Sequence, residues 1–381
     1  MYYTRSLGKS KPFFEKCGKL NIKNTVNLFF CISAFVLHSH FKRDMIEKGA
    51  DSSAPIFKVR KGMIRFMADS QSRQVRWGEK RYHSMDYDLK KTYGEKVYKI
   101  TLDGGMTCPN RDGTVGRGGC VFCSASGSGD FAGSRALSIT EQLKNGKAAL
   151  AGKRPVHSYI AYFQAFTNTY ASVEYLERIF LEAVRDGEVR ILSIATRPDC
   201  LGKPVLELLE RLSRIKPVWI ELGLQTIHPH TAAYIRRGYE LPVFEEAVQN
   251  LRSRGIDVLV HTILCLPGET RQQMFETLDY LNRMDIQGIK LQLLHILKGT
   301  DLALQYAEHP FPVPSMDEYI GLLGACISRL RPDITIHRLT GDGPKELLIA
   351  PLWTGQKRTV LNALHQYLKE QDIWQGKDYH E

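Results

Sequence analysis

The chain has 381 residues, 43% of them hydrophobic, which is enough to bury one large core or two smaller ones. Its eight cysteines contain one close pair, so the disulfide framework of a small secreted protein is not indicated. The formal net charge of +11 is compatible with a nucleic-acid partner, but residues 1–66 carry 13 Lys and Arg against 4 Asp and Glu, and the rest of the chain is nearly neutral. Charge by itself therefore does not predict a nucleic-acid-binding surface on that larger part.

Residues 1–66 differ in kind from the sequence that follows. An apolar run at residues 26–37 is shorter than the ~20 residues that a membrane-spanning helix needs, so we expect no stable membrane insertion. No small-residue cleavage site of a signal peptide follows this run. We expect residues 1–66 to be an atypical basic extension from an over-early start codon, with Met63 or Met67 as the true start. A loosely attached membrane-surface segment is the alternative.

Three cysteines in the glycine-rich segment 101–133 are the strongest chemical signal in the sequence. Cys108, Cys120 and Cys123 supply soft thiolate ligands, which suit zinc or an iron–sulfur cluster. A closed zinc site needs four ligands, whereas three cysteines leave one iron of a four-iron cluster open to a small molecule. Six glycines between residues 104 and 119 allow the loop to turn backbone N–H groups toward such a cluster. A zinc site completed by a histidine or aspartate, or three buried packing thiols, remain alternatives.

From about residue 82 onward, β-rich apolar runs alternate with helical patterns. The expected helices include residues 172–187, where Ser172 is placed to cap the first turn, and residues 204–215, 242–255 and 271–285. The expected strands are residues 96–102, 158–163, 190–195, 218–224, 258–264, 289–294 and 334–337. This alternation predicts an α/β fold of parallel units with right-handed crossovers. We expect a partial (β/α) barrel of about six or seven units over residues 67–340 and a C-terminal helical extension over residues 341–381.

Polar residues follow several of these strands, at the end where active sites of such folds gather. Their carboxylate, amide and guanidinium groups could bind the polar groups of a cofactor, although each residue could instead cap a helix or close a turn. The residues are Gln164, Asn168, Thr169, Thr196, Arg197, Asp199, Glu221, Gln225 and Thr226.

Six motifs, in order, resemble the radical S-adenosylmethionine (SAM) superfamily. The cysteine segment is similar to the branch with a widened first cysteine interval and an aromatic residue, here Phe122, before the last cysteine. More narrowly, that segment with YFQAFTNTY, ATRPDC, ELGLQT, HTILCLPGET and LLHILKGT resembles the YhcC/YtqA group, which is related to the Elongator catalytic subunit. The resemblance covers about residues 80–352. It implies a [4Fe-4S] cluster on Cys108, Cys120 and Cys123, with SAM on the fourth iron. Gln164, Asn168, Arg197, Glu221 and Gln225 are then the candidates for SAM binding.

The resemblance also implies a reaction. A reduced cluster would cleave SAM, and the resulting 5′-deoxyadenosyl radical would abstract hydrogen from the substrate. Because this step requires no general base, we expect His261 and His295 to be structural. We expect an electron donor such as flavodoxin or ferredoxin and a cytoplasmic location.

The implied substrate is the wobble uridine of tRNA, whose carboxymethylaminomethyl group would be converted to aminomethyl. Basic and aromatic residues could receive RNA or form a solvated rim: Arg236, Arg237, Tyr239, Lys290, Lys298, and Arg358 near Trp353. A radical enzyme acting on a small molecule, a porphyrin or a peptide is the alternative. A zinc-binding module without catalysis is a more distant one.

One position departs from the pattern of the related proteins. The pattern has Leu-Gly-Leu-Pro-Gly-Glu-Thr where this chain has Cys265 in place of the first glycine. That glycine allows the backbone to approach the adenosyl group, so the side chain of Cys265 puts the local fit in question. We expect Cys265 not to bind the cluster, and Cys200 and Cys326 to be packing residues.

Overall fold

The computed structural model describes residues 77–152, 157–341 and 343–380, which belong to one structural unit, Arg73–Glu381. Residues 1–66, for which the sequence predicts an atypical basic extension or a membrane-surface segment, lie outside the described part of the chain. Among the helices that the structure describes, none has the length and apolar composition needed to cross a membrane.

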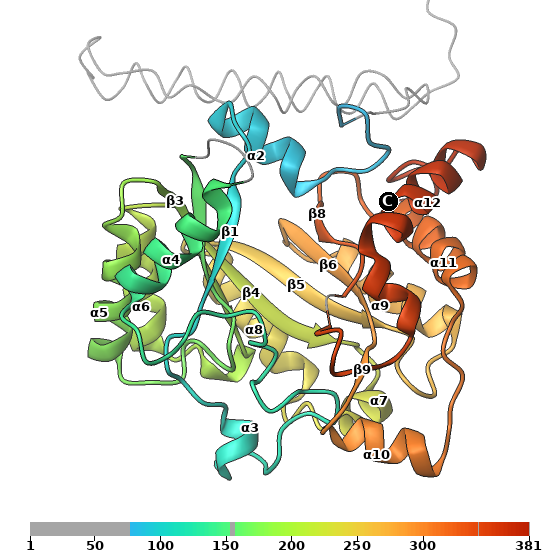
Figure 1. Cartoon of the computed structure of the whole chain (residues 1–381), viewed down its shortest axis with the longest axis horizontal. Coiled ribbons are helices and arrows are strands. Elements are labelled where there is room, and N and C mark those ends of the chain that lie inside the picture. Colours follow the sequence, from blue (N-terminus) through green and yellow to red (C-terminus); the bar gives the residue numbers. More distant parts are fainter. Residues whose placement is uncertain (1–76, 153–156, 342, 381) are drawn as a thin grey trace, which may run out of the picture. The chain divides into compact units, whose positions relative to one another are not determined.

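Seven parallel strands form one curved sheet, ordered β1-β2-β3-β4-β5-β6-β8 (Figure 1). Every strand predicted from the sequence is present within about two residues, so the half-barrel prediction is confirmed. A separate antiparallel pair joins β7 (Ile296–Leu297) to β9 (Leu348–Ala350). The sheet strands are β1 (Tyr98–Leu102), β2 (Tyr159–Phe163), β3 (Val189–Thr196), β4 (Val218–Gln225), β5 (Asp257–Leu264), β6 (Gly288–Leu293) and β8 (Thr335–Arg338).

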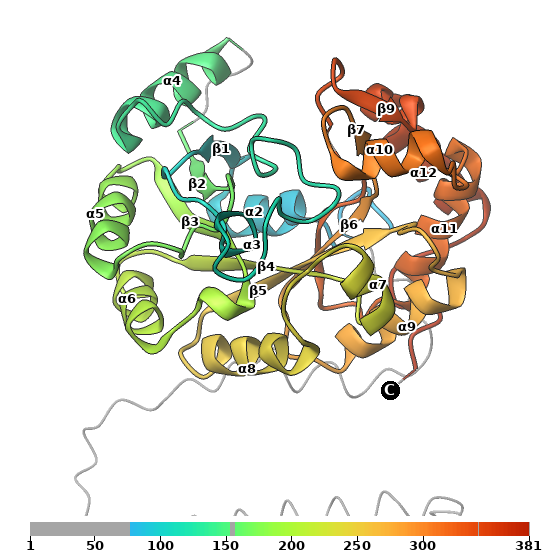
Figure 2. The ribbon, with the colours of Figure 1, turned by 90° about the horizontal axis from the view of Figure 1, so that it is seen from below.

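Helices between the strands cover the outer, convex face of the sheet (Figure 2). Their starts follow from side-chain caps: Ser172 accepts from the Tyr175 N–H at the start of α5, and Thr270 forms a capping box with Gln273 in α9. The covering helices are α4 (Ile139–Ala151), α5 (Val173–Val184), α6 (Lys203–Ser213), α8 (Leu241–Arg252), α9 (Arg271–Asn282) and α11 (Met316–Arg329). The remaining described helices are α2 (Met85–Tyr93), α3 (Pro109–Asp112), α7 (Pro229–Tyr234), α10 (Asp301–Glu308) and α12 (Lys357–Glu370), with 3₁₀ turns at Pro198–Cys200 and Leu352–Gln356.

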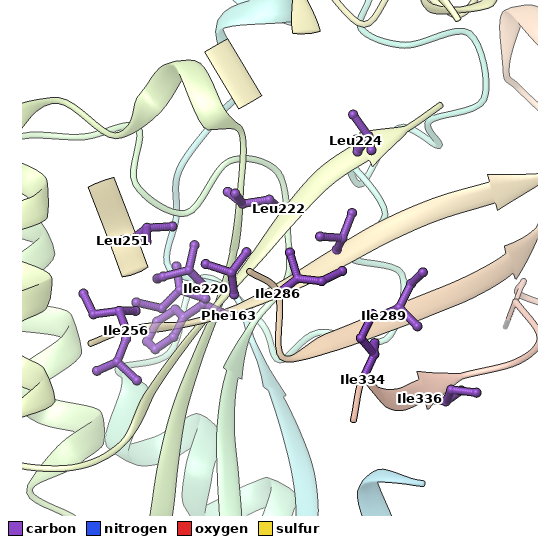
Figure 3. Packing of buried hydrophobic residues seen from close by; sticks show 14 of the residues in the cluster. Phe163, Ile220, Leu222, Leu224, Leu251, Ile256, Ile286, Ile289, Ile334 and Ile336 are labelled. Atoms are coloured by element: carbon purple, nitrogen blue, oxygen red, sulfur yellow. The ribbon is translucent and has the colours of Figure 1, made fainter. Parts of the chain in front are cut away.

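Strand alternation separates the hydrophobic core from the barrel interior. On β4, Ile220, Leu222 and Leu224 point outward and pack in the main core with residues such as Leu251 and Ile286 (Figure 3). The residues between them on β4 point to the opposite face, because successive side chains of a strand alternate. The interior therefore receives polar residues from strands whose outer faces are aliphatic. Two residues of α12, Leu364 and Leu368, also join the main core, and the boundary predicted at residue 340 stays a prediction.

Helix α2 lies at the end of the sheet where the strands begin, opposite α3, α7 and α10 (Figure 1). Its Leu89 is 3% exposed and packs in a second apolar cluster with Ile160, Tyr162 and Ile191 of the inner face. Apolar residues thus fill the end of the barrel interior where the strands begin.

Candidate active site

A cavity of about 790 Å³ occupies the barrel interior, and residues from all seven strands of the large sheet line it. The thiols of Cys108, Cys120 and Cys123 lie on its wall, carried by the loop after β1. The structure thus brings together most of the site residues that the sequence predicted. Gln164, Arg197, Glu221 and Gln225 also line the cavity, whereas Asn168 does not.

The cysteine loop is held by two side chains that sequence reasoning missed. Arg111 donates to the carbonyl oxygens of Cys123 (3.2 Å) and Ser124 (2.5 Å). Asn110 donates to the carbonyl of Arg236 (2.5 Å) and lies 3.5 Å from the sulfur of Cys120. They lie two and three residues after Cys108 in the sequence.

Glycine is required next to the second cysteine. Gly119 has φ +87°, and a Cβ placed on it would lie 2.8 Å from Nε of Arg111. The loop can therefore wrap around the Arg111 guanidinium because no side chain is present at residue 119.

Two of the three thiols lie within hydrogen-bonding reach of each other. The pKa of Cys123 is lowered to about 7, mainly by a hydrogen bond from Cys120 and also by Ser128 and Arg111, against the raising effect of burial. The same hydrogen bond, together with burial, raises the pKa of Cys120. Within the described residues, no three His, Cys, Asp or Glu side chains are placed to hold a single metal ion, so these thiols border a wider space.

Two predicted cofactor-binding amides contact backbone carbonyls. Gln164 donates to the carbonyl of Ser128 (2.6 Å). Gln225 has φ +64°, and its amide nitrogen reaches the carbonyls of Gly223 (3.1 Å) and Leu224 (3.0 Å). Both residues remain candidates for SAM contact because they line the cavity.

Asn168 connects two strand ends. Its side-chain nitrogen and its backbone N–H both donate to the carbonyl of Ala195, at 2.8 and 3.2 Å. The residue is fully buried. It therefore joins the β2 loop to β3, which is the turn-closing alternative weighed from the sequence.

Arg197 is already paired. Its Nε and Nη2 donate to the carboxylate of Asp199 at 2.9 and 2.7 Å, and Nη1 donates to the carbonyl of Arg237 at 2.7 Å. A SAM carboxylate at this position would have to compete with Asp199 for the guanidinium.

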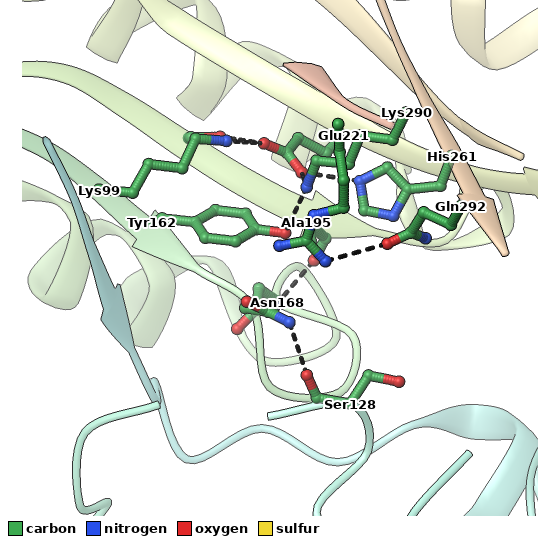
Figure 4. Close-up of polar contacts among 12 residues, drawn as sticks. Lys99, Ser128, Tyr162, Asn168, Ala195, Glu221, His261, Lys290 and Gln292 are labelled. Atoms are coloured by element: carbon green, nitrogen blue, oxygen red, sulfur yellow. Dashed lines mark hydrogen bonds and ion pairs between the residues drawn. The ribbon is translucent and has the colours of Figure 1, made fainter. Parts of the chain in front are cut away.

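Glu221 is the centre of a buried network (Figure 4). One carboxylate oxygen accepts from Lys99 and Ser193, both at 2.8 Å, and the other accepts from His261 at 2.7 Å and from Lys290. Burial would raise the pKa of Glu221, but Lys290 and Lys99 hold it well below its usual range. With four donors in place, a ribose hydroxyl could bind Glu221 only by displacing one of them.

His261 is neutral in this network. Burial and the charge of Lys290 lower its pKa to about 4, against the raising effect of Glu221. The histidine is hydrogen-bonded to the carboxylate, and the structural role expected for it stays a prediction.

Three residues expected to receive RNA are part of the interior. Arg237 is 3% exposed and donates to the carbonyls of Leu224 and Thr226, and Lys290 is 2% exposed. The hydroxyl of Tyr239 donates to a backbone carbonyl of β4. Arg237 and Lys290 are therefore not part of an exposed rim, which was one of the two roles weighed for them; all three residues line the cavity, and contact with a substrate stays a prediction.

Cys265 adopts a backbone conformation that favours glycine, the residue that the pattern described above has at this position. Its φ is +63°, in the left-handed region that residues with a Cβ rarely adopt. Burial raises the pKa of its thiol to about 12, and Cys265 does not line the cavity that holds the three other cysteines.

Two protein-family models match the part of the chain that forms this site. The Radical SAM superfamily model matches residues 111–281, and the Radical_SAM C-terminal domain matches residues 286–370. YtqA of Bacillus subtilis (strain 168) is 46% identical over 299 residues, which are 78% of this chain and 93% of YtqA. The chain belongs to the radical SAM superfamily. It is an enzyme of the YhcC type and uses a [4Fe-4S] cluster and SAM.

Other similarities are more distant. YhcC of Escherichia coli (strain K12) is 38% identical over 287 residues, 75% of this radical SAM chain and 92% of YhcC. A tRNA uridine(34) acetyltransferase of Methanocaldococcus jannaschii is 23% identical over 190 residues, 48% of this chain and 33% of that protein. The structure of Methanocaldococcus infernus Elp3 with an N-terminal deletion shares the fold, with a TM-score of 0.56 and 15% identity. That match covers 73% of this chain and 64% of the Elp3 chain, less than two thirds of its length.

Proposed function

We propose that Cys108, Cys120 and Cys123 hold the [4Fe-4S] cluster and that SAM lies along the strand ends beside them. The observation that carries this proposal is that the three thiols line one cavity with Gln164, Gln225 and the other strand-end residues. Held there, the cluster and SAM would supply the radical chemistry for hydrogen abstraction from a substrate. The residues that line the cavity would position both cofactors.

A cysteine substitution tests the ligand assignment. The Cys120→Ala protein, purified without oxygen, should contain far fewer than the about four irons per chain expected of the wild type, because two thiolates hold a cubane cluster poorly. It should also lose SAM cleavage. Cys200→Ala is the matched control, since Cys200 lies outside the cavity. Equal iron content in wild type and Cys120→Ala would refute the assignment.

We further propose that the substrate is the wobble uridine of tRNA, with carboxymethylaminomethyl converted to aminomethyl. The distant similarity to a protein named for tRNA uridine(34) supports this substrate. Exposed basic residues also support it: Lys345 at the cavity edge, Lys298, whose backbone N–H donates to the carbonyl of Leu347 (2.7 Å), and Arg358 on α12. We propose that flavodoxin or ferredoxin supplies the electron and that the enzyme acts in the cytoplasm.

Nucleoside mass spectrometry tests this substrate. A strain without the gene should accumulate carboxymethylaminomethyluridine in tRNA and lose its aminomethyl product. In vitro, Lys345→Ala with Arg358→Ala should weaken tRNA binding several-fold and reduce its salt dependence, because fewer phosphates are contacted. Lys203→Ala on α6 is the control, since its side chain is 85% exposed on the outer layer. An unchanged nucleoside profile in a strain known to make the modification would exclude the substrate.

A further inference from the structure

The strand residues that line the cavity include more basic than acidic side chains. Among the described strand residues that line the cavity, Lys290 and Arg338 are basic and Glu221 is acidic. Lys99 contacts the same carboxylate from β1. Two ammonium groups thus share one carboxylate in a region closed by apolar residues.

The carboxylate of Glu221 cannot neutralise the positive charges of both lysines. Each oxygen of Glu221 accepts two donors, and His261 contributes no negative charge. Lys290 uses two of its three donors, one on the Tyr162 hydroxyl (3.0 Å) and one on Glu221. Burial, with Lys99 and Arg338, lowers the pKa of Lys290 well below its usual value, so its charged form is incompletely compensated. An anion placed here would supply that compensation.

Figure 4 shows Tyr162, Glu221, His261, Lys290 and Gln292 converging on one region of the interior. Arg338 reaches the same region, where it donates to Gln292 (3.1 Å). We propose that this group of residues, the basic floor, binds a carboxylate of the substrate while the three cysteines hold the cluster elsewhere on the cavity wall. The inference rests on the proposed function, because the carboxymethylaminomethyl group carries such a carboxylate.

The basic floor would position the substrate by its charged end. A carboxylate that accepts from Lys290 and Tyr162 would fix one end of the side chain to be modified. Uridines without the carboxylate would lack this anchor, which gives the enzyme a means to discriminate its substrate from its product.

A first test uses a simple anion and does not depend on tRNA. Anaerobic crystals of the cluster-loaded protein, soaked in sodium bromide, should show an anomalous peak beside Nζ of Lys290. The peak should disappear in Lys290→Met and persist in Lys298→Met, which changes an exposed lysine. Absence of the wild-type peak would overturn the inference and leave the proposed function in place.

A second test measures calorimetrically the binding of two nucleosides to the cluster-loaded protein. Carboxymethylaminomethyluridine should bind at least about 10-fold more tightly than aminomethyluridine, as expected for a charge-assisted contact. Lys290→Met should remove this difference, and Glu221→Gln should enlarge it because the competing carboxylate is lost. Misfolding cannot produce opposite changes in the two variants. If the bromide peak appears but the two nucleosides bind equally tightly, the anion site is supported. The wobble uridine is then refuted as its occupant.

Discussion

At the scale of single residues, Cys265 combines a functional motif with an unfavourable backbone conformation. The residue keeps φ +63° although it carries a Cβ, and its N–H contacts the sulfur of Met274 at 3.2 Å. A left-handed residue other than glycine costs about 1–2 kcal/mol. The surrounding β5–α9 connection therefore imposes the conformation on a residue that does not prefer it.

Substitutions at residue 265 should separate backbone strain from packing. Cys265→Gly and Cys265→Ala both remove the thiol, but only glycine relieves the strain, so the free energy of unfolding should be about 0.5–1 kcal/mol higher for the glycine variant. Urea denaturation of both variants measures this difference. Gly268→Ala, at φ +83° and with no atom within 4 Å of the added Cβ, should lose a similar amount as a control. Equal stability of the two Cys265 variants would show that the strain is relieved in another way.

At the scale of secondary-structure elements, α2 determines where the cavity ends. The helix begins at a Ser84 cap and ends at Gly94 in the left-handed conformation, and its buried side chain Leu89 packs beneath the inner face of the sheet. The polar network around Glu221 contacts this apolar layer through Tyr162, which belongs to both. Packing of α2 thus supports the residues of the basic floor.

Truncation of Leu89 should test this support. Leu89→Ala should lower the free energy of unfolding by about 2–5 kcal/mol, because a buried leucine is replaced and a cavity remains. Lys91→Ala on the same helix is exposed and should change stability by less than about 0.5 kcal/mol. Denaturant titration of the two variants measures both values. A loss as small as that of Lys91→Ala would mean that α2 does not close the barrel.

At the scale of the whole molecule, the fold concentrates its polar groups in one cavity. The strands contribute aliphatic side chains to the outer core and polar side chains to the interior. The loop after β1 brings the three cysteines to the same cavity. The positive charge of the interior is therefore separate from the excess of basic residues in residues 1–66. Net charge described neither feature, because it adds the charges of the whole sequence without regard to where along the chain they occur.

The sequence by itself determined the order of strands and helices, the cysteine loop and the family. These features are local: residue periodicity, caps such as Ser172, and motifs of contiguous residues are all visible along the chain. The inward positions of Lys99 and Lys290 were not predicted, although polar residues at alternate positions of apolar strands were a signal that could have revealed them.

Only the tertiary structure decided how these polar groups are used. Lys99 and Glu221 are 122 residues apart, and Arg197 meets the carbonyl of Arg237 across 40 residues, so neither pairing could be inferred from spacing. Arg237 and Lys290 were weighed as RNA contacts or as part of a solvated rim, yet both are buried: Arg237 donates to carbonyls at the end of β4, and Lys290 lies on the inner face of β6. The physical reason is that hydrogen-bond partners and burial depend on which strands become neighbours, and that information lies in the closed fold rather than in any one segment.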